Sequence, residues 1–268
     1  MLPLNSKDFP QSASDFERAV EEGLRRYVRK DGRIVTISAR VFPYLDEVAM
    51  NLDGAQIDSS LLAPVSLAGE TKHACEAAIV TMGARNVLIQ GVPVSLRMEV
   101  RDVVFHQGKD AAGDAFLVVQ KAREGHIVVS AEQLDLEKMI AEAARVQAAK
   151  NGVSIENVRL ALRARGARSI AANVRLQAKK LLFRANIDIA GQLDITDDFV
   201  AKTSQLKCKG DGAIGSLACG VLEPHLQRLN GATFPLMSLP LGEIRLRDIR
   251  IAVADTVEIT ADFGTDDS

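Results

Sequence analysis

The segment Ser130–Gly152, SAEQLDLEKMIAEAARVQAAKNG, divides the chain nearly in half and has its clearest helical pattern. Ser130 is a favourable N-cap, and Gln133 three residues later completes a capping box. Asn151 and Gly152 are typical of a helix stop, because both residue types accept the left-handed conformation that ends many helices. The sequence therefore predicts a helix over this segment.

The predicted helix has an apolar stripe on one side. Apolar residues recur at the spacing of a single helix face: Leu136, Met139, Ile140, Ala143 and Val146. The chain on either side mostly alternates between apolar and polar residues, with the period of two that is typical of half-buried strands. A solitary helix between β-runs must bury its stripe against a sheet, so this helix organises the fold.

Two further helices are predicted. One covers residues 14–30, where Ser14 is the expected N-cap and Glu17 completes a capping box. Its apolar stripe is formed by Phe16, Val20, Leu24 and either Tyr27 or Val28. The other covers Ser216–Leu229, and Pro224 inside it should kink or split the helix because proline lacks a backbone N–H.

The order of these segments indicates an α+β fold with two helix-plus-β halves. Connections between the predicted strands are mostly short turns, which favours antiparallel pairing. We expect a loose arm at residues 1–13, one domain at residues 14–263 with halves 14–129 and 130–263, and an acidic tail at residues 264–268.

The composition is that of an ordinary globular protein, with 47% apolar and 25% charged residues in a chain of 268. The net charge of -2 gives no reason to expect nucleic-acid binding. No stretch approaches the roughly 18 apolar residues of a membrane span, and the first residues lack the basic and apolar regions of a signal peptide. These features favour a cytoplasmic location.

The chain contains three cysteines, Cys75, Cys208 and Cys219, which are widely spaced. An odd number at this spacing predicts neither a disulfide framework nor a zinc site. We expect three buried thiols in a reducing compartment.

The candidate cofactor motif fails on its context. Gly210, Gly212 and Gly215 match the spelling of a dinucleotide-binding loop. The neighbouring strands read as antiparallel, and no acidic residue stands at the distance needed to hold a ribose. We interpret the motif as a tight turn that needs positive φ, followed by a helix capped by Ser216. The four histidines lack metal-ligand spacing, so we expect no metal site. With no catalytic motif and no dinucleotide loop, we also expect no catalytic residues and no cofactor.

Basic residues fill the segment from Arg159 to Arg184, with no acidic residue between them. Along strands they could form a face that attracts anionic lipid headgroups, at about 1 kcal/mol for each basic residue near the surface. Alternatively, they are the polar side of amphipathic strands. The residues selected for a headgroup surface are Arg163, Arg165, Arg168, Lys179 and Lys180.

Several short stretches resemble the LmeA-like family of bacterial proteins, which is grouped with the tubular lipid-binding (TULIP) superfamily. In the second half these are LQAKKLLF at residues 176–183, IDIAGQLDI at 187–195, LKCKGDG at 206–212 and LPLGEIRL at 239–246. In the first half, GRIVTI at residues 32–37 and FPYL at 42–45 are similar to the family's opening strand and its aromatic-proline break. VVSAEQL at residues 128–134 resembles the entry into its middle helix.

The resemblance covers about residues 14–263. It implies a long helix wrapped by a highly curved antiparallel sheet, with a hydrophobic groove between them. It also implies binding of phospholipid or another acyl-chain ligand without turnover. The resemblance transfers no catalytic residues.

The first functional hypothesis is a non-enzymatic carrier of lipid or another hydrophobic ligand, peripheral to a membrane. The residues expected to line its groove are Leu136, Met139, Ile140, Ala143, Val146, Val94, Leu96, Met98, Leu181 and Phe183. The alternative is a structural or scaffold subunit that has the same fold with a filled core and pairs its exposed strand edges with a protein partner. An enzyme is not favoured, because the sequence shows no convergent polar set.

Overall fold

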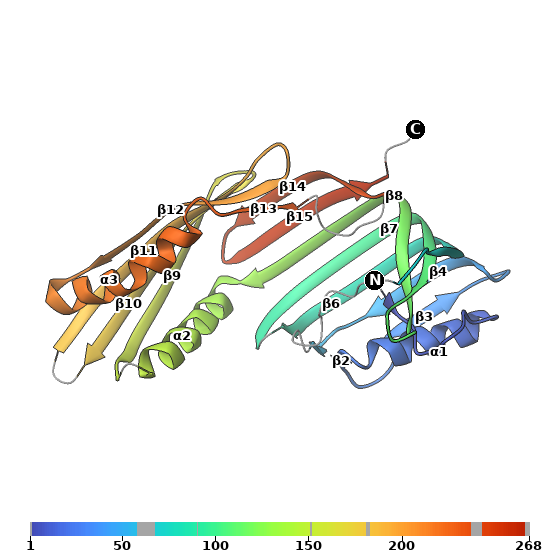
Figure 1. Cartoon of the computed structure of the whole chain (residues 1–268), viewed down its shortest axis with the longest axis horizontal. Helices are drawn as coiled ribbons and strands as arrows, with labels where there is room; N and C mark the ends of the chain where they lie inside the picture. The colour runs from blue at the N-terminus through green and yellow to red at the C-terminus, as the bar shows by residue number, and fades with distance from the viewer. Residues whose placement is uncertain are drawn as a thin grey trace. The chain divides into compact units, whose positions relative to one another are not determined.

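The computed structural model describes residues 2–57, 68–89, 91–150, 152–180, 183–236 and 243–265. The chain divides into two compact units (Figure 1). Unit 1 contains Met1–Ser130, Pro240–Asp248 and Thr260–Ser268. Unit 2 contains Ala131–Leu239 and Ile249–Ile259.

Along the described chain, runs of several strands are separated by single helices, in a mixed α+β arrangement. The helices are α1 (Ala13–Leu24), α2 (Gln133–Ala149) and α3 (Gly212–Leu229). The strands are β1 (Leu2–Pro3), β2 (Val28–Arg29), β3 (Val35–Ser38), β4 (Tyr44–Asn51), β5 (Gln56–Ile57), β6 (Lys72–Ile89), β7 (Val92–Lys109), β8 (Ala115–Glu132), β9 (Ser154–Gly166), β10 (Ser169–Lys180), β11 (Phe183–Ile195), β12 (Val200–Gly210), β13 (Thr233–Pro235), β14 (Arg245–Val253) and β15 (Thr256–Gly264). The predicted α+β class with mainly antiparallel strands is confirmed. β4 and β5 depart from it, because both pair with β6 in parallel.

Strands β1 to β7 belong to unit 1, and β8, β14 and β15 contribute residues to both units. Together they form the larger sheet, in the order β14-β15-β8-β7-β6-β4-β3, with β1, β2 and β5 attached to this path. Its three long strands β6, β7 and β8 each have 18 residues. β6 continues without a break through a register shift between Ala84 and Val87. Asn86, with φ at 54°, lies within this bulge, and the extra residues are absorbed without ending the strand.

Helix α1 packs its apolar stripe against the core of unit 1. Phe16 and Val20 are each only 1% exposed, which confirms the predicted stripe. The helix begins one residue earlier than expected, because the side chain of Ser12, and not that of Ser14, accepts the capping hydrogen bond. It ends at Leu24, since the chain then pairs as strand β2 with β5.

The first residues of the chain are packed onto unit 1. Leu2 and Pro3 pair with β8, and Leu4 belongs to the core. A Cβ atom added to Gly23 on α1 would lie 2.1 Å from the carbonyl oxygen of Pro3. The glycine therefore allows the backbone of β1 to approach the helix closely.

Unit 2 is built on a five-stranded antiparallel sheet in the order β13-β12-β11-β10-β9. Helix α2 packs against β9, and α3 packs against β11 and β12 (Figure 1). Residues from both helices and from the sheet form one apolar cluster, so both helices cover the same face of the sheet. Its buried members are Ala141, Val158, Leu176, Ala178, Ile187 and Cys219.

The boundaries of α2 differ from the predicted ones. Ser130 is not the N-cap, because it still belongs to β8 and pairs with Ser95 of β7. The N-cap is Glu132, which makes no side-chain capping hydrogen bond. The predicted capping box is therefore wrong, since Ser130 is held in a strand pair and β8 continues to Glu132.

Helix α3 begins four residues before the expected start, with Asp211 at its N-cap position. It continues through Pro224 as one element, so the expected split does not occur. Proline still removes one backbone hydrogen bond, but contacts with β11 and β12 hold the helix in place. Among the helices that the structure describes, none combines the length and apolar character that crossing a membrane requires.

Candidate functional site

The residues predicted to line a ligand groove fall in both units. Val94, Leu96 and Met98 lie on β7 in unit 1. The side chains of Leu96 and Met98 pack against the core of that unit, and Val94 lies opposite Val87 of β6. Leu181 is outside the described residues.

In unit 2, helix α2 buries only part of its predicted stripe. Ile140 packs against the apolar cluster, together with Ala144. Leu136 is half-buried and Ala143 is exposed. Met139 is 38% exposed and Val146 55% exposed. The stripe is thus split between a covered part and a part that faces solvent.

The orientation of α2 follows from polar contacts with the edge strand β9. The Glu137 carboxylate accepts a hydrogen bond of 2.7 Å from the backbone N–H of Leu160. Gln133 donates its side-chain amide to the carbonyl oxygen of the same residue, at 3.1 Å. Arg159 lies 3.6 Å from the second oxygen of Glu137. These contacts turn Glu137 toward the sheet, and a sequence pattern based on apolar residues alone did not reveal that rotation.

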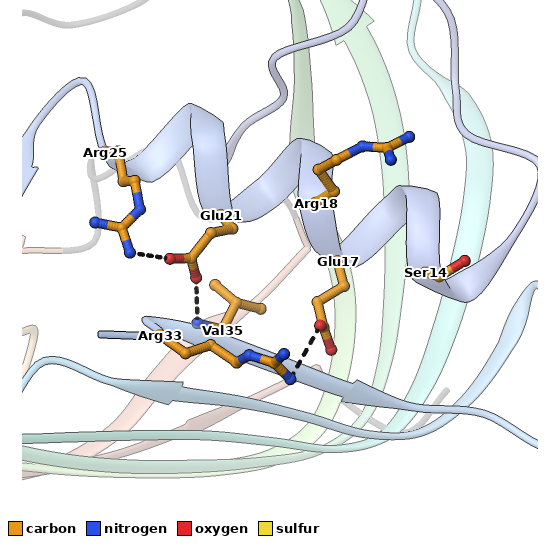
Figure 2. A pocket seen from close by; sticks show the side chains of 7 residues that line it. All are labelled: Ser14, Glu17, Arg18, Glu21, Arg25, Arg33 and Val35. Carbon is orange, nitrogen blue, oxygen red and sulfur yellow. Dashed lines mark hydrogen bonds and ion pairs between the residues drawn. The ribbon is translucent and has the colours of Figure 1, made fainter. Parts of the chain in front are cut away.

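Unit 1 repeats this arrangement at α1 and the edge strand β3 (Figure 2). One carboxylate oxygen of Glu21 accepts hydrogen bonds from the backbone N–H groups of Ile34 and Val35, at 2.8 and 2.7 Å. One oxygen of Glu17 accepts from the N–H of Ile37 at 2.7 Å. A helix side chain therefore satisfies the edge-strand amides in both units.

A pocket of about 380 Å³ lies beside these contacts in unit 1. Figure 2 shows its lining: Ser14, Glu17, Arg18, Glu21, Arg25, Arg33 and Val35. The other oxygen of Glu21 lies 2.6 Å from Arg25, and that of Glu17 lies 3.4 Å from Arg33. Both carboxylates are therefore engaged on both oxygens. In this pocket between helix and strand, each glutamate is paired with an arginine. None of the predicted ligand-lining residues belongs to it.

A second kind of surface lies on the helices of unit 2. Large apolar side chains are exposed on α2 at Leu134, Met139 and Val146, and on α3 at Leu217, Val221 and Leu229. Leu217 is 71% exposed and Val221 66% exposed, and their four-residue spacing places them on the same face of α3. Phe183 at the start of β11 and Phe234 on β13 are also exposed. We call this set the apolar helix surface.

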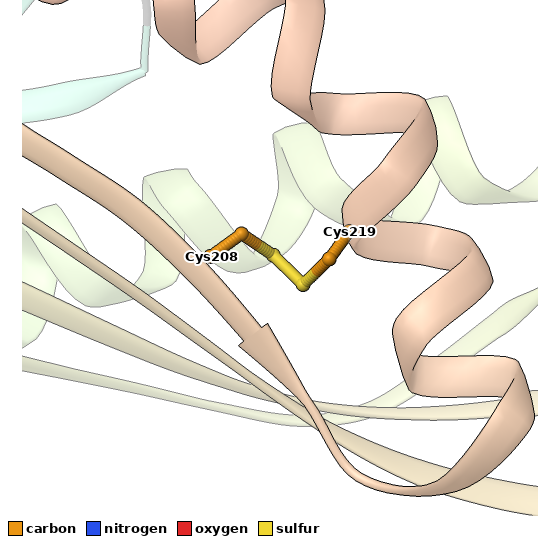
Figure 3. The surroundings of a disulfide bond; sticks show 2 residues. All are labelled: Cys208 and Cys219. Carbon is orange, nitrogen blue, oxygen red and sulfur yellow. A yellow bond between two sulfur atoms is a disulfide. The ribbon is translucent and has the colours of Figure 1, made fainter.

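A disulfide bond joins α3 to the sheet. Cys208 of β12 is bonded to Cys219 of α3 (Figure 3). The prediction of three free thiols is therefore wrong for these two residues. It failed because their contact requires α3 to fold back onto β12, which cysteine spacing does not reveal. Cys75 is a free, buried thiol, and burial, with a smaller contribution from Glu76, raises its pKa to about 12.

The glycines between β12 and α3 have structural roles. Gly212 has φ at +65°, which confirms the predicted turn with positive φ. A Cβ atom on Gly210 would lie 2.1 Å from the carbonyl oxygen of Gly215, and one on Gly215 would lie 2.7 Å from the carbonyl carbon of Gly210. Close packing of the strand end against the helix start thus accounts for the motif without a nucleotide.

The predicted headgroup residues differ in their surroundings. Arg163 and Arg165 are exposed on β9. Lys179 lies 3.8 Å from Glu156, and Lys180 ends β10, although its side chain is outside the description. Arg168 has a different environment from the others. Its guanidinium lies 3.0 Å from a carboxylate oxygen of Asp197 and 5.2 Å from the ring centre of Phe199, and it donates to the carbonyl oxygen of Ile249 at 3.2 Å.

The histidines are dispersed over unit 1 and α3. His73 lies 3.3 Å from Glu76, and His126 lies 2.6 Å from Asp262. Within the described ranges no three His, Cys, Asp or Glu side chains are grouped so that they could hold a metal ion. The chain matches no protein-family model, no curated protein and no solved structure, so the family resemblance stays a prediction.

Proposed function

We propose that the chain is a non-enzymatic binding or transfer protein for phospholipid or another acyl-chain ligand. The observation that carries the proposal is the apolar helix surface of unit 2. Four of its members are Met139 and Val146 on α2 and Leu217 and Val221 on α3, all exposed. These exposed apolar side chains on both helices are candidates for contact with an apolar partner, since exposed apolar patches mark interaction sites.

The packing beneath this surface supports the same proposal. The helices contribute mainly small residues to their contact with the sheet, namely Ala141, Ala144, Ala218 and Cys219 beside Ile140. Such a contact buries little apolar area and leaves the larger side chains for another apolar partner. An acyl chain fits this demand, because it has apolar surface along its whole length and needs no hydrogen-bonding groups.

The tubular arrangement is part of the proposal. In it, the antiparallel sheet of unit 2 curves around α2, and the ligand occupies the groove between them. Met139, Ala143 and Val146 would contact the acyl chain from α2, and Leu217 and Val221 would contact it from α3. Phe183, exposed at the start of β11, would contact it from the sheet. Val94, Leu96 and Met98 belong to unit 1, where the latter two pack against the core, and they stay weaker candidates.

The scaffold alternative is less well supported at the strand edges. It requires edges that can pair with a partner protein. At β3 and β9 part of each edge is occupied, because Glu17 and Glu21 bond to the first and Glu137 to the second.

The disulfide also bears on location, since such bonds persist in oxidising compartments. A cytoplasmic location is therefore not part of the proposal.

Native mass spectrometry after mild purification tests the proposal, together with uptake of a fluorescent phospholipid by the delipidated protein. We expect lipid to be retained and taken up. The double variant Leu217→Asp, Val221→Asp should reduce uptake at least tenfold, because it places two charges on the apolar helix surface. The control variant Ser216→Asp, His225→Asp adds charge of the same sign at exposed polar positions of α3 and should retain uptake. Absence of both retained and acquired lipid in the wild type would contradict the proposal.

A further inference from the structure

The sheet of unit 2 has a second face, directed away from the apolar cluster. Side chains alternate along each strand, and Val174, Leu176 and Ala178 of β10 are in or against the cluster. Arg175 therefore lies on the opposite face, where its guanidinium donates to Asp188 of β11 at 2.9 Å. We call this side the outer face.

The strand register arranges the side chains of the outer face in rows across the four strands β9, β10, β11 and β12. One row contains Arg159, Arg175, Asp188 and Lys209. The next contains Ala161, Asn173, Ala190 and Lys207, and the one after contains Arg163, Ala171, Gln192 and Ser204. In the second and third rows, the central strands carry the uncharged residues Asn173, Ala190, Ala171 and Gln192. The long basic side chains of these two rows, Lys207 and Arg163, lie on the outer strands β12 and β9.

The outer face carries a strong positive charge in a chain whose net charge is -2. Its eight basic residues are Arg159, Arg163, Arg175, Lys179, Arg184, Lys202, Lys207 and Lys209. Its three acidic residues are Glu156, Asp188 and Asp194. Eight against three leaves a net charge of +5.

Internal ion pairs neutralise one part of this charge and leave another. Asp188 is engaged by Arg175, and Glu156 by Lys179 and Arg184. Arg159 is also paired, because it lies 3.6 Å from Glu137 of α2. Within the described part of the chain, Arg163, Lys207 and Lys209 form no ion pair with a carboxylate and are exposed. These three side chains come from the outer strands β9 and β12, on the two sides of the face.

We propose that the outer face docks on the headgroup surface of an anionic membrane. Charge complementarity selects an anionic partner, and each basic residue near a membrane surface adds to the attraction. On the two central strands, the small residues Ala171, Asn173 and Ala190 allow the basic groups of β9 and β12 to reach one plane of headgroups together. The residues of the four-strand rows include no aromatic side chain, whereas sheet faces that bind single-stranded nucleic acid use aromatic rings to stack bases.

This surface differs from the headgroup residues expected from the sequence. It retains Arg163 and Lys179 and adds Lys207 and Lys209, which lie outside the basic segment of the sequence. It omits Arg168, whose guanidinium contacts Asp197, Phe199 and Ile249. The apolar helix surface lies on the other side of the sheet, so membrane docking does not depend on the proposed ligand binding.

Co-sedimentation with vesicles tests the proposal. Vesicles of phosphatidylcholine alone are compared with vesicles that also contain phosphatidylserine. We expect the 268-residue chain to bind the phosphatidylserine vesicles at least tenfold more strongly, and we expect added salt to weaken that binding. The variant Arg163→Glu, Lys207→Glu, Lys209→Glu should lose the preference.

A matched variant controls for overall charge. Arg29→Glu, Lys72→Glu, Arg97→Glu makes the same charge change at exposed positions of unit 1 and should retain the preference. A glutamine series at Arg163, Lys207 and Lys209 gives the same test if the glutamate variant does not fold. Equal binding to both vesicles, equal loss in the two variants, or binding to an RNA oligonucleotide without vesicle binding would overturn the proposal. The variant Leu217→Asp, Val221→Asp should still bind the phosphatidylserine vesicles. This result would separate a failure of membrane docking from a failure of lipid uptake.

Discussion

The carboxylate of Glu137 on α2 bonds to the backbone N–H of Leu160 on the edge strand β9, at 2.7 Å. In unit 1, Glu21 on α1 makes the equivalent contact with Val35 of the edge strand β3, also at 2.7 Å. Unpaired edge amides invite pairing with another chain. In both units a carboxylate from the preceding helix fills part of that edge.

Replacing Glu137 by alanine should destabilise unit 2. The Leu160 N–H would lose its partner in a partly buried position, which costs about 1–3 kcal/mol. Urea unfolding followed by circular dichroism measures the change. Glu142→Ala on the same helix is the control, because the Glu142 side chain is 72% exposed and its distance of 3.8 Å from Arg145 is long for an ion pair. It should change stability by less than about 0.5 kcal/mol, and equal losses in the two variants would contradict the assigned role of Glu137.

Removal of the disulfide should weaken the attachment of α3. The double variant Cys208→Ser, Cys219→Ser releases a short loop, for which the expected loss is roughly 3 kcal/mol. Urea unfolding of the oxidised protein, the reduced protein and the double variant measures it. The reduced wild type and the variant should agree. Unchanged stability after complete reduction would show that α3 is held by other contacts alone.

Cys75 should not react with a thiol reagent in the folded protein. Burial raises the pKa of its thiol to about 12, so the reactive thiolate is scarce at neutral and mildly alkaline pH. Titration with Ellman's reagent should detect no thiol in the native protein and one after unfolding. It should detect three after unfolding with reduction, since the chain has three cysteines and one disulfide. Rapid native reaction would contradict this burial.

Substitution of Gly125 by alanine should strain unit 1 through Phe263. A Cβ atom at Gly125 would lie 2.1 Å from the Phe263 ring, which packs over the β8 backbone at this point. We expect a loss of about 1–3 kcal/mol in thermal or urea unfolding. The effect of Gly125→Ala should become smaller in a Phe263→Ala background. Gly83→Ala is the control, because no atom of the described residues, apart from Gly83 and its chain neighbours, lies within 4 Å of the added Cβ.

The stability of unit 2 should depend on Asp194 at acid pH. Hydrogen bonds from Ser169, Gln192 and Ser204 hold the pKa of the Asp194 carboxyl below its ordinary value of 3.8. A lowered pKa in the folded state contributes stability that is present above the unfolded pKa and is lost as the pH falls through the folded pKa. Urea unfolding between neutral pH and about pH 2 should therefore show a weaker acid dependence in Asp194→Asn. An unchanged acid dependence would contradict this coupling.

Local patterns in the sequence were sufficient for the general class and for several details of the fold. The alternation of period two predicted the strands, and helical spacing predicted the buried positions of Phe16 and Val20. Turn chemistry predicted positive φ in the loop at Gly212. These features depend on residues close together in the chain, so they are visible in the sequence alone.

Contacts between distant segments decided the rest. Pairing of Ser130 with Ser95 moved the start of α2. The hydrogen bond between Leu160 and Glu137 holds α2 in an orientation in which Met139 and Val146 face solvent while Ile140 is covered.

The sequence by itself determined an α+β chain with amphipathic helices and mainly antiparallel strands, because periodicity and turn preferences act over a few residues. The tertiary structure alone decided the Cys208–Cys219 bond, the part of the α2 stripe that stays exposed, and the row that joins Arg159 to Lys209 across four strands. The physical reason is that sheet register and helix docking place distant residues together, and the spacing of residues along the chain does not specify either.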